Sequence, residues 1–245
     1  MTAEVTQLWR HPIKSHGREA VQTVTVNPGQ TMPGDRVWAV AHEASEADGS
    51  AWVPCANFSR GAKAPQLMAI SARTDGDKLT LSHPDRPDLS FAPDSGQDAF
   101  LDWVKPLMPT DRAASARIVR VPGRGMTDSD YPSISLCNMA SHRAVGQKLG
   151  QELSPARWRG NIWFDGAPLW EEFDWLGRDV KIGEAVFHIR EPITRCLATT
   201  ANPETGKRDA DTLAALETWG HQEFGVYAEV ITGGAISVGD KVELL

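Results

Sequence analysis

The sequence predicts a mainly β protein, with a β-barrel domain, a smaller amino-terminal β-barrel-like domain and a few short helices. Apolar and polar residues alternate with a period of two in many short segments, which is typical of strands with one buried face. Glycine, proline and Asp-Gly pairs separate these segments at short intervals, as they do in barrels and sandwiches. Helical spacing of apolar residues is rare.

Strands are expected wherever this alternation is bounded by turn residues. The clearest case is 21–26, which Asn27-Pro28-Gly29 ends. Asp75-Gly76, a favoured hairpin pair, separates the segments 66–73 and 78–82. Further strands are expected before Pro12 and at 37–41, 117–121, 161–164, 180–190, 227–231 and 241–245.

Three segments have apolar residues at helical spacing. The segment 138–149 carries Met139, Val145 and Leu149 on one face, and Asn138 stands where an N-cap is expected. The other two are 212–223 and 98–107.

The segment 85–96 is rich in proline and aspartate and is expected to be a linker. It would divide an amino-terminal β domain, residues 1–95, from a larger carboxy-terminal domain, residues 96–245. Both parts are long enough to bury a core.

Composition excludes several classes of partner. The chain has 245 residues, a net charge of -7 and no basic run of five residues, so nucleic acid is not an expected partner. Three cysteines cannot form a paired disulfide framework, and no Cys-x-x-Cys is present for a structural zinc. The amino terminus does not resemble a signal peptide, and no apolar stretch approaches the roughly 18 residues of a membrane span. We therefore expect a cytoplasmic protein with no membrane partner.

Cys196 is the strongest candidate for chemistry. It lies beside Arg195 at the end of an apolar strand-like segment, and a neighbouring cation lowers the pKa of a thiol. The thiolate is the form that binds metals and attacks electrophiles. A packed core thiol is the alternative interpretation. Cys55 and Cys137 have no basic neighbour and are interpreted as structural.

Basic and amide residues stand at the ends of several predicted strands. Lysine beside a hydroxyl, and arginine beside glycine, are suited to phosphate oxygens, although exposed charges of this kind are more often only solvated. The four segments concerned are Lys14-Ser15, Gly34-Asp35-Arg36, Arg157-Trp158-Arg159-Gly160-Asn161 and Thr194-Arg195-Cys196. The acidic run 171–174 is interpreted as a solvated loop, with a supply of a catalytic acid or base as the alternative.

In their joint order these segments resemble the MOSC superfamily, named after the carboxy-terminal domain of molybdenum cofactor sulfurase. The resemblance is to the branch with an extra amino-terminal β domain, to which the mitochondrial amidoxime-reducing component belongs. It covers the whole chain through the segments 9–15, 34–36, 157–162, 175, 182–183, 194–196, 202–206, 224–226 and 236–242.

The resemblance implies a molybdenum cofactor, a molybdenum–pterin group, held between the two domains. Cys196 would be the catalytic residue and the thiolate ligand of the metal, which suits a metal already bound by sulfur. The cofactor-binding residues would be Lys14, Ser15, Arg36, Asn138, Arg159, Asn161, Thr194 and Arg195. Three positions depart from the family pattern. Asn138 replaces a serine or threonine, Gly160 replaces a common proline, and Ile193 replaces a small or sulfur-bearing residue.

The implied function is reduction of small N-hydroxylated or N-oxide compounds by oxygen-atom transfer at molybdenum. The chain shows no second redox centre, so a separate protein would donate the electrons. Two alternatives use the same thiol. One is a non-catalytic carrier of the molybdenum cofactor, and the other is a sulfur carrier whose Cys196 persulfide comes from a pyridoxal-phosphate-dependent desulfurase.

Overall fold

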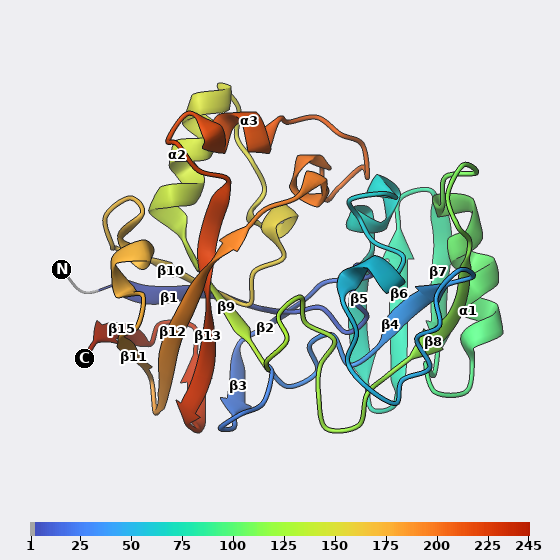
Figure 1. Ribbon diagram of the computed structural model, residues 1–245, viewed down its shortest axis with the longest axis horizontal. Helices are drawn as coiled ribbons and strands as arrows, with labels where there is room; N and C mark the ends of the chain where they lie inside the picture. The colour runs from blue at the N-terminus through green and yellow to red at the C-terminus, as the bar shows by residue number, and fades with distance from the viewer. Residues whose placement is uncertain (1–2) are drawn as a thin grey trace.

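The computed structural model describes residues 3–245, which form two halves joined side by side (Figure 1). The larger half, at the left of Figure 1, is a closed barrel of seven strands. These strands are β1 (Ala3–Arg10), β9 (Ile134–Asn138), β10 (Ile162–Asp165), β11 (Asp179–Ile182), β12 (Ala185–Thr194), β13 (Glu223–Thr232) and β15 (Lys241–Leu244). Around the barrel the order is β10-β9-β13-β12-β11-β15-β1, and β1 pairs with β10 to close it.

Three short strands extend the larger half. β2 (Glu19–Val21) pairs with β1 outside the closed ring, and β3 (Thr23–Val26) pairs with β14 (Gly234–Ser237). The barrel is filled by apolar side chains at alternate strand positions, among them Leu8, Phe164 and Phe187. This burial is what the period-two pattern predicts.

The smaller half has two separate sheets and one helix over a second core. β4 (Ala39–His42) pairs with β8 (Ser115–Val119), and β5 (Ser71–Asp75), β6 (Lys78–His83) and β7 (Arg86–Phe91) form a meander. α1 (Gln97–Val104) buries Phe100 and Trp103 against these sheets. Among the described residues the fold is therefore mainly β, with only three short α-helices, as predicted.

The helices of the larger half cover one end of the barrel. α2 (Met139–Leu149) begins at Asn138, whose side chain accepts a hydrogen bond of 2.9 Å from the amide of Ala140, so the predicted N-cap is confirmed. α3 (Thr212–Glu217) is shorter than expected, because a turn at 218–220, with Gly220 at positive φ, follows it. Six 3-10 segments, η1 (Cys55–Asn57), η2 (Pro65–Ala69), η3 (Lys105–Leu107), η4 (Pro155–Trp158), η5 (Glu171–Trp175) and η6 (Leu197–Thr200), complete the secondary structure.

The expectation of a linker at 85–96 is wrong. Half of that segment is β7, which pairs with β6 and places Leu89 opposite Leu81. Pro87 is tolerated because β7 lies at the edge of its sheet, where no ladder hydrogen bond is lost.

Strand pairing also crosses the expected boundary between residues 95 and 96. β1 belongs to the barrel of the carboxy-terminal half, while α1 and β8 pack in the smaller half. The domain boundary between residues 95 and 96 stays a prediction. β1, from before this boundary, lies in the larger half, and α1 and β8, from after it, lie in the smaller half. No helix among residues 3–245 is both long and apolar enough to cross a membrane. A cytoplasmic location stays a prediction.

Candidate functional site

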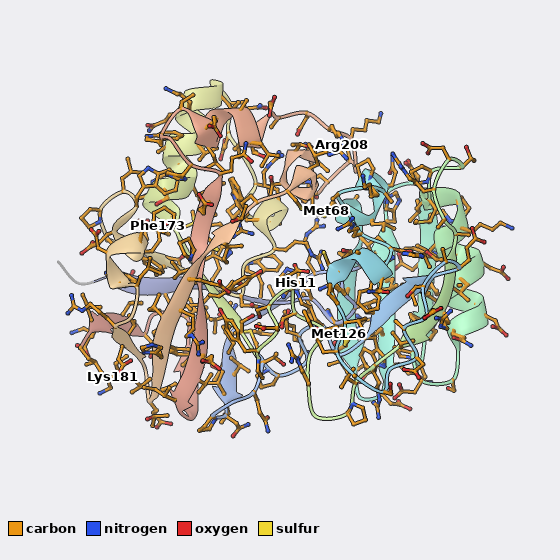
Figure 2. The ribbon with its side chains drawn as sticks, in the orientation of Figure 1. His11, Met68, Met126, Phe173, Lys181 and Arg208 are labelled. Carbon is orange, nitrogen blue, oxygen red and sulfur yellow. The ribbon has the colours of Figure 1, made fainter. Side chains whose placement is uncertain are left out.

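A cavity of about 250 Å³ lies where the two halves meet, and we call it the cation cavity. Its residues come from loops of both halves. Seven of the nine predicted site residues line it, namely Lys14, Ser15, Arg36, Arg159, Thr194, Arg195 and Cys196. Figure 2 labels Met68, which also lines the cavity, and Arg208, which donates to the carbonyl of Ala62, at this junction.

Three of these residues have a left-handed backbone. The φ angles of Ser15, Arg36 and Arg159 are 63°, 49° and 53°, and Trp170 is the one other non-glycine residue of 3–245 with positive φ. Such a conformation is unfavourable for a side chain with a Cβ and is maintained only by the surrounding structure. Strain of this kind is concentrated at functional sites.

Hydrogen bonds fix Arg36 and Lys14 at the base of the cation cavity. The Arg36 amide donates to the carbonyl of His11 at 2.7 Å, and its guanidinium donates to Asp35 and to the carbonyl of Arg159. Lys14 is 4% exposed and donates to Asp128 at 2.6 Å. Two cations are thereby held in fixed positions.

Asp35 links His11 and Arg36 through its carboxylate. Its carboxylate accepts bonds of 2.7 and 3.0 Å from the amide and ring of His11. Burial alone would raise the pKa of Asp35, but the charge of Arg36 and the bonds from His11 hold it well below its usual range. Burial lowers the pKa of His11 to about 3, so this ring is neutral at pH 7. Asp35 therefore balances one cation of the cluster.

Arg159 adds a cation that has no carboxylate partner among residues 3–245. It follows η4, and its guanidinium donates to the carbonyl of Gly17 at 3.1 Å. Burial and the nearby charge of Arg36 lower the pKa of Arg159 to about 9. A cation that is partly removed from water is costly unless an anion pairs with it. The cation cavity is thus suited to an anionic ligand.

Cys196 is exposed and lies two residues beyond the end of β12, so its predicted place at a strand end is confirmed. The neighbouring Arg195 also lines the cavity, and backbone carbonyls hold its guanidinium. Its guanidinium donates to the carbonyls of Phe224 and Trp158 at 2.8 Å, and it lies 3.8 Å from the sulfur of Cys137. Arg195 therefore joins the end of β12 to η4 and β13, and Cys196 lines the cavity beside it.

Asn138 and Asn161 do not line the cation cavity. Asn138 is fully buried and donates to Pro168 and Glu172 from the start of α2. Asn161 is 2% exposed, accepts bonds from Ser135 and donates to the carbonyl of Trp9, so it joins three strands of the barrel. Both amides satisfy buried backbone groups, which a sequence pattern does not distinguish from ligand binding.

The cation cavity is also lined by residues that were not predicted as site residues, among them Cys55, Arg60, Asp128 and Tyr227. Cys55, interpreted as structural, accepts a bond of 3.2 Å from Arg60. No sequence signal distinguishes Arg60, because its pairing with a following glycine also occurs at Arg124-Gly125, which does not line the cavity. Nothing in the sequence marks Tyr227.

The acidic run at 171–174 is not a solvated loop throughout. Glu172 is fully buried in η5, and burial raises the pKa of its carboxyl to about 7. It accepts bonds from Asn138 and Ser141 at the start of α2. Its role is to join η5 to α2.

The sequence comparisons agree with this architecture. Residues 2–105 match the family model described as the MOSC N-terminal beta barrel domain, and residues 126–243 match the MOSC domain. The mouse mitochondrial amidoxime-reducing component 1 is 26% identical over 98% of this chain and 82% of its own length. A molybdenum cofactor sulfurase of Drosophila grimshawi is 33% identical over 53% of this chain and 18% of its own length.

A solved structure supports the fold alone. The YUAD protein of Bacillus subtilis aligns with a TM-score of 0.52 at 13% identity and covers all of this chain and 96% of its own. With both domain models matched in order over most of the residues, the chain belongs to the MOSC family, as a MOSC N-terminal beta barrel domain followed by a MOSC domain.

Proposed function

We propose that this protein binds a molybdenum–pterin cofactor in the cation cavity and uses it to reduce small N-hydroxylated or N-oxide compounds. One observation carries the proposal. An exposed thiol, Cys196, shares one cavity with buried cations from both halves of the chain. The names of relatives similar over 98% of the chain, the mitochondrial amidoxime-reducing components of mouse and human, agree with this chemistry.

The residues fit the two ends of such a cofactor. The phosphate would be held by Arg159, Arg36 and Lys14, because charge-assisted hydrogen bonds to phosphate are strong. Arg159 is available for this role because it forms no ion pair with a carboxylate among residues 3–245. Cys196 would bind the metal through sulfur, and the pterin would supply its other sulfur ligands. Among residues 3–245 no three His, Cys, Asp or Glu side chains gather as a metal site.

When bound, the group supplies a two-electron redox centre. In the overall reaction two electrons and two protons convert an N-hydroxyl compound into the amine and water. The protein holds the cofactor and leaves an open side at Cys196 for substrate. A separate protein would donate the electrons.

The test is an assay of protein purified from a host that makes the cofactor. Molybdenum and phosphorus are measured first, and turnover of benzamidoxime with a chemical electron donor is measured next. We expect equal molar amounts of the two elements and reduction to benzamidine. Fully loaded protein that does not reduce benzamidoxime or any other N-hydroxylated compound would remove the proposal.

A sulfur-carrier function is the second candidate. It is favoured by the relative named molybdenum cofactor sulfurase and by the presence of a second thiol, Cys55, in the cation cavity. Mass spectrometry separates the two functions. One added sulfur atom on Cys196 after incubation with a pyridoxal-phosphate-dependent desulfurase and cysteine supports the carrier, and an unmodified thiol contradicts it.

A further inference from the structure

Two segments that are distant in the chain meet at the cation cavity. One is residues 197–209, which we call the strap. It follows Cys196, the N-cap residue of η6, and its residue Ala198 lines the cavity. The other is the loop of the smaller half that contains Gly61, which also lines the cavity. A Cβ added at Gly61 would lie 3.5 Å from the Cβ of Ala198, so the strap and this loop are in contact.

The strap is ordered by its own hydrogen bonds and is held on the larger half. The amide of Asn202 donates to the carbonyl of Lys207 at 2.7 Å. Arg157, in η4, donates to the carbonyl of Thr199 at 3.0 Å and to Asp209 at 3.1 Å, near the two ends of the strap. The strap can therefore move as a unit without losing its local structure.

Arg208 joins the strap to the smaller half through backbone groups. Its guanidinium donates to the carbonyl of Leu197 and the hydroxyl of Thr200 within the strap, and to the carbonyl of Ala62 at 2.9 Å in the smaller half. The bond to Ala62 is exposed to water. Exposed hydrogen bonds of this kind open at a low cost in free energy.

An ion pair forms the second connection. Arg18 donates to the carbonyl of Met68 in η2 at 3.0 Å and to the carboxylate of Glu204 in the strap at 2.9 Å. The side chain of Glu204 is 70% exposed. A pair of this kind contributes little to stability, because water competes for both charges.

The third connection is a close contact that leaves a polar atom unsatisfied. Gly206 has a φ of 66°, and a Cβ added to it would lie 2.6 Å from Oε1 and 2.7 Å from Cα of Gln66. That oxygen of Gln66 is buried and has no hydrogen-bond partner in the described part of the chain. A buried acceptor without a partner costs free energy, and release of the strap would return it to water. The closed position is therefore only weakly favoured.

The other side of the junction is held by the backbone itself. The chain passes between the halves in the segments 27–38 and 120–133. The amide of Met126 donates to the carbonyl of Arg36 at 2.7 Å, which bonds these two segments to each other. Figure 2 labels Met126 in the lower part of the junction and Arg208 in the upper part. The halves can thus separate at the strap while they stay joined at Met126.

We propose that the strap is a mobile closure of the cation cavity, which releases from Ala62, Gln66 and Arg18 to admit a bulky anion and closes after it. Lys14, at the base, is 4% exposed, so a bulky ligand reaches it only through a wider opening. This inference concerns access for any large ligand and does not depend on the proposed reduction.

The test measures the access of thiol reagents of two sizes. Cys55 is the reporter, because it lines the cavity and is half-buried. The full chain, purified from a host that makes no pterin cofactor, reacts with iodoacetamide, which is small, or with fluorescein maleimide, which is bulky. Peptide mass spectrometry gives the rate of labelling at each cysteine. Release of the strap should limit only the bulky reagent.

Glu204→Gln removes the ion pair with Arg18. It should raise the rate of fluorescein maleimide at Cys55 by about twofold to fivefold, the range that a surface pair contributes, and leave the rate of iodoacetamide unchanged. The control is Glu217→Gln, which removes an exposed charge from α3. This control should change neither rate.

Gly206→Ala forces the strap away from Gln66. The added methyl meets a backbone atom there, so the rate of fluorescein maleimide at Cys55 should rise at least about fivefold. The control is Gly150→Ala, which places a methyl at the same φ of 66° with nothing within 4 Å. It should leave the rate unchanged.

Two results would overturn the proposal. One is an unchanged rate of the bulky reagent in Gly206→Ala. The other is an equal rise for both reagents together with labelling of the buried Cys137, which would show general loosening. Because the readout needs neither cofactor nor turnover, either result leaves the proposed reduction standing, and a failed benzamidoxime assay leaves the strap.

Discussion

At the residue scale, the three cysteines show how position determines the chemistry of one residue type. Cys196 is exposed, and its sulfur takes part in no hydrogen bond of the described chain. Cys137 is fully buried, and burial raises the pKa of its thiol to about 12 despite the nearby Arg195. Cys137 is a neutral core thiol, and Cys196 is open to a ligand.

Cys196→Ser and Cys137→Ser should therefore have opposite effects. Cys196→Ser should change the free energy of unfolding by less than about 0.5 kcal/mol, because the residue is exposed. It should abolish reduction of N-hydroxylated compounds. Cys137→Ser should lower the free energy of unfolding by about 1–3 kcal/mol, because a hydroxyl replaces a buried apolar sulfur. Denaturant unfolding and the turnover assay check both, and a fully active Cys196→Ser would contradict the ligand role.

Arg159 gives a second prediction at this scale. Because its charge is buried near Arg36, Arg159→Met should leave the stability of the ligand-free protein unchanged or raise it. The same change should weaken phosphate binding by more than about tenfold, since one charge-assisted bond to a buried anion is lost. The readout is the rise in melting temperature with phosphate concentration.

The control for Arg159→Met is Arg73→Met, which removes an exposed arginine from β5. This variant should respond to phosphate as the natural protein does. An Arg159→Met protein that phosphate stabilises as strongly as the natural one would show that the anion binds elsewhere.

At the element scale, glycine allows the segment before β10 to pack closely against β9. A Cβ added at Gly160 would lie 2.6 Å from the sulfur of Cys137 and 3.1 Å from the indole nitrogen of Trp163. Gly160 begins the turn from η4 into β10, so its contact with β9 sets the position of Arg159. The absence of the proline that the family pattern favours is explained by this close approach.

Gly160→Ala should lower the free energy of unfolding by about 1–3 kcal/mol, as overpacking does. Adding Cys137→Ala should restore part of this loss, because it removes the sulfur that the new methyl meets. Denaturant unfolding of the two single variants and the double variant measures the coupling. Strictly additive effects would show that the two residues do not compete for the same space.

At the scale of the whole molecule, buried histidines make stability depend on pH. Burial lowers the pKa of His11 to about 3 and of His16 and His142 to about 4. In the unfolded chain histidine titrates near 6.5, so unfolding takes up protons as the pH falls from about 6.5 to about 4. Their contribution is complete above this range and is lost as the pH decreases.

Glu172 acts in the opposite direction. Burial raises the pKa of Glu172 to about 7, so its contribution is present below its unfolded pKa and is lost as the pH rises through about 7. The free energy of unfolding should therefore be highest in weakly acidic solution and fall toward pH 4. Each histidine should account for roughly 2–3 kcal/mol of that fall.

His16→Gln tests the origin of this slope. Glutamine can keep a bond to the carbonyl of Lys14, which the ring of His16 contacts at 2.7 Å, and it does not titrate. The difference in free energy of unfolding between the natural protein and His16→Gln should shrink as the pH falls from 7 to 4. Parallel pH profiles would contradict the assignment.

The sequence by itself determined the local features of this protein. Period-two alternation located most strands, and the residue types at strand ends located Lys14, Arg36, Arg159 and Cys196, all of which line one cavity. These features follow from short-range sterics, periodicity and side-chain chemistry, and a local sequence pattern is enough to predict such effects. A local pattern does not predict a contact between residues that are distant in the chain.

Only the tertiary structure decided which segments meet. β1 pairs with β10, about 150 residues away, and so carries Lys14 to the junction of the two halves. Asn161 resembles a ligand in sequence, yet it bonds to Ser135 and to β1 because the barrel closes around it. Alternation shows that a strand has a buried face, but it does not show which strand covers that face. Long-range pairing therefore selected the residues of the cavity from a larger set of suitable side chains.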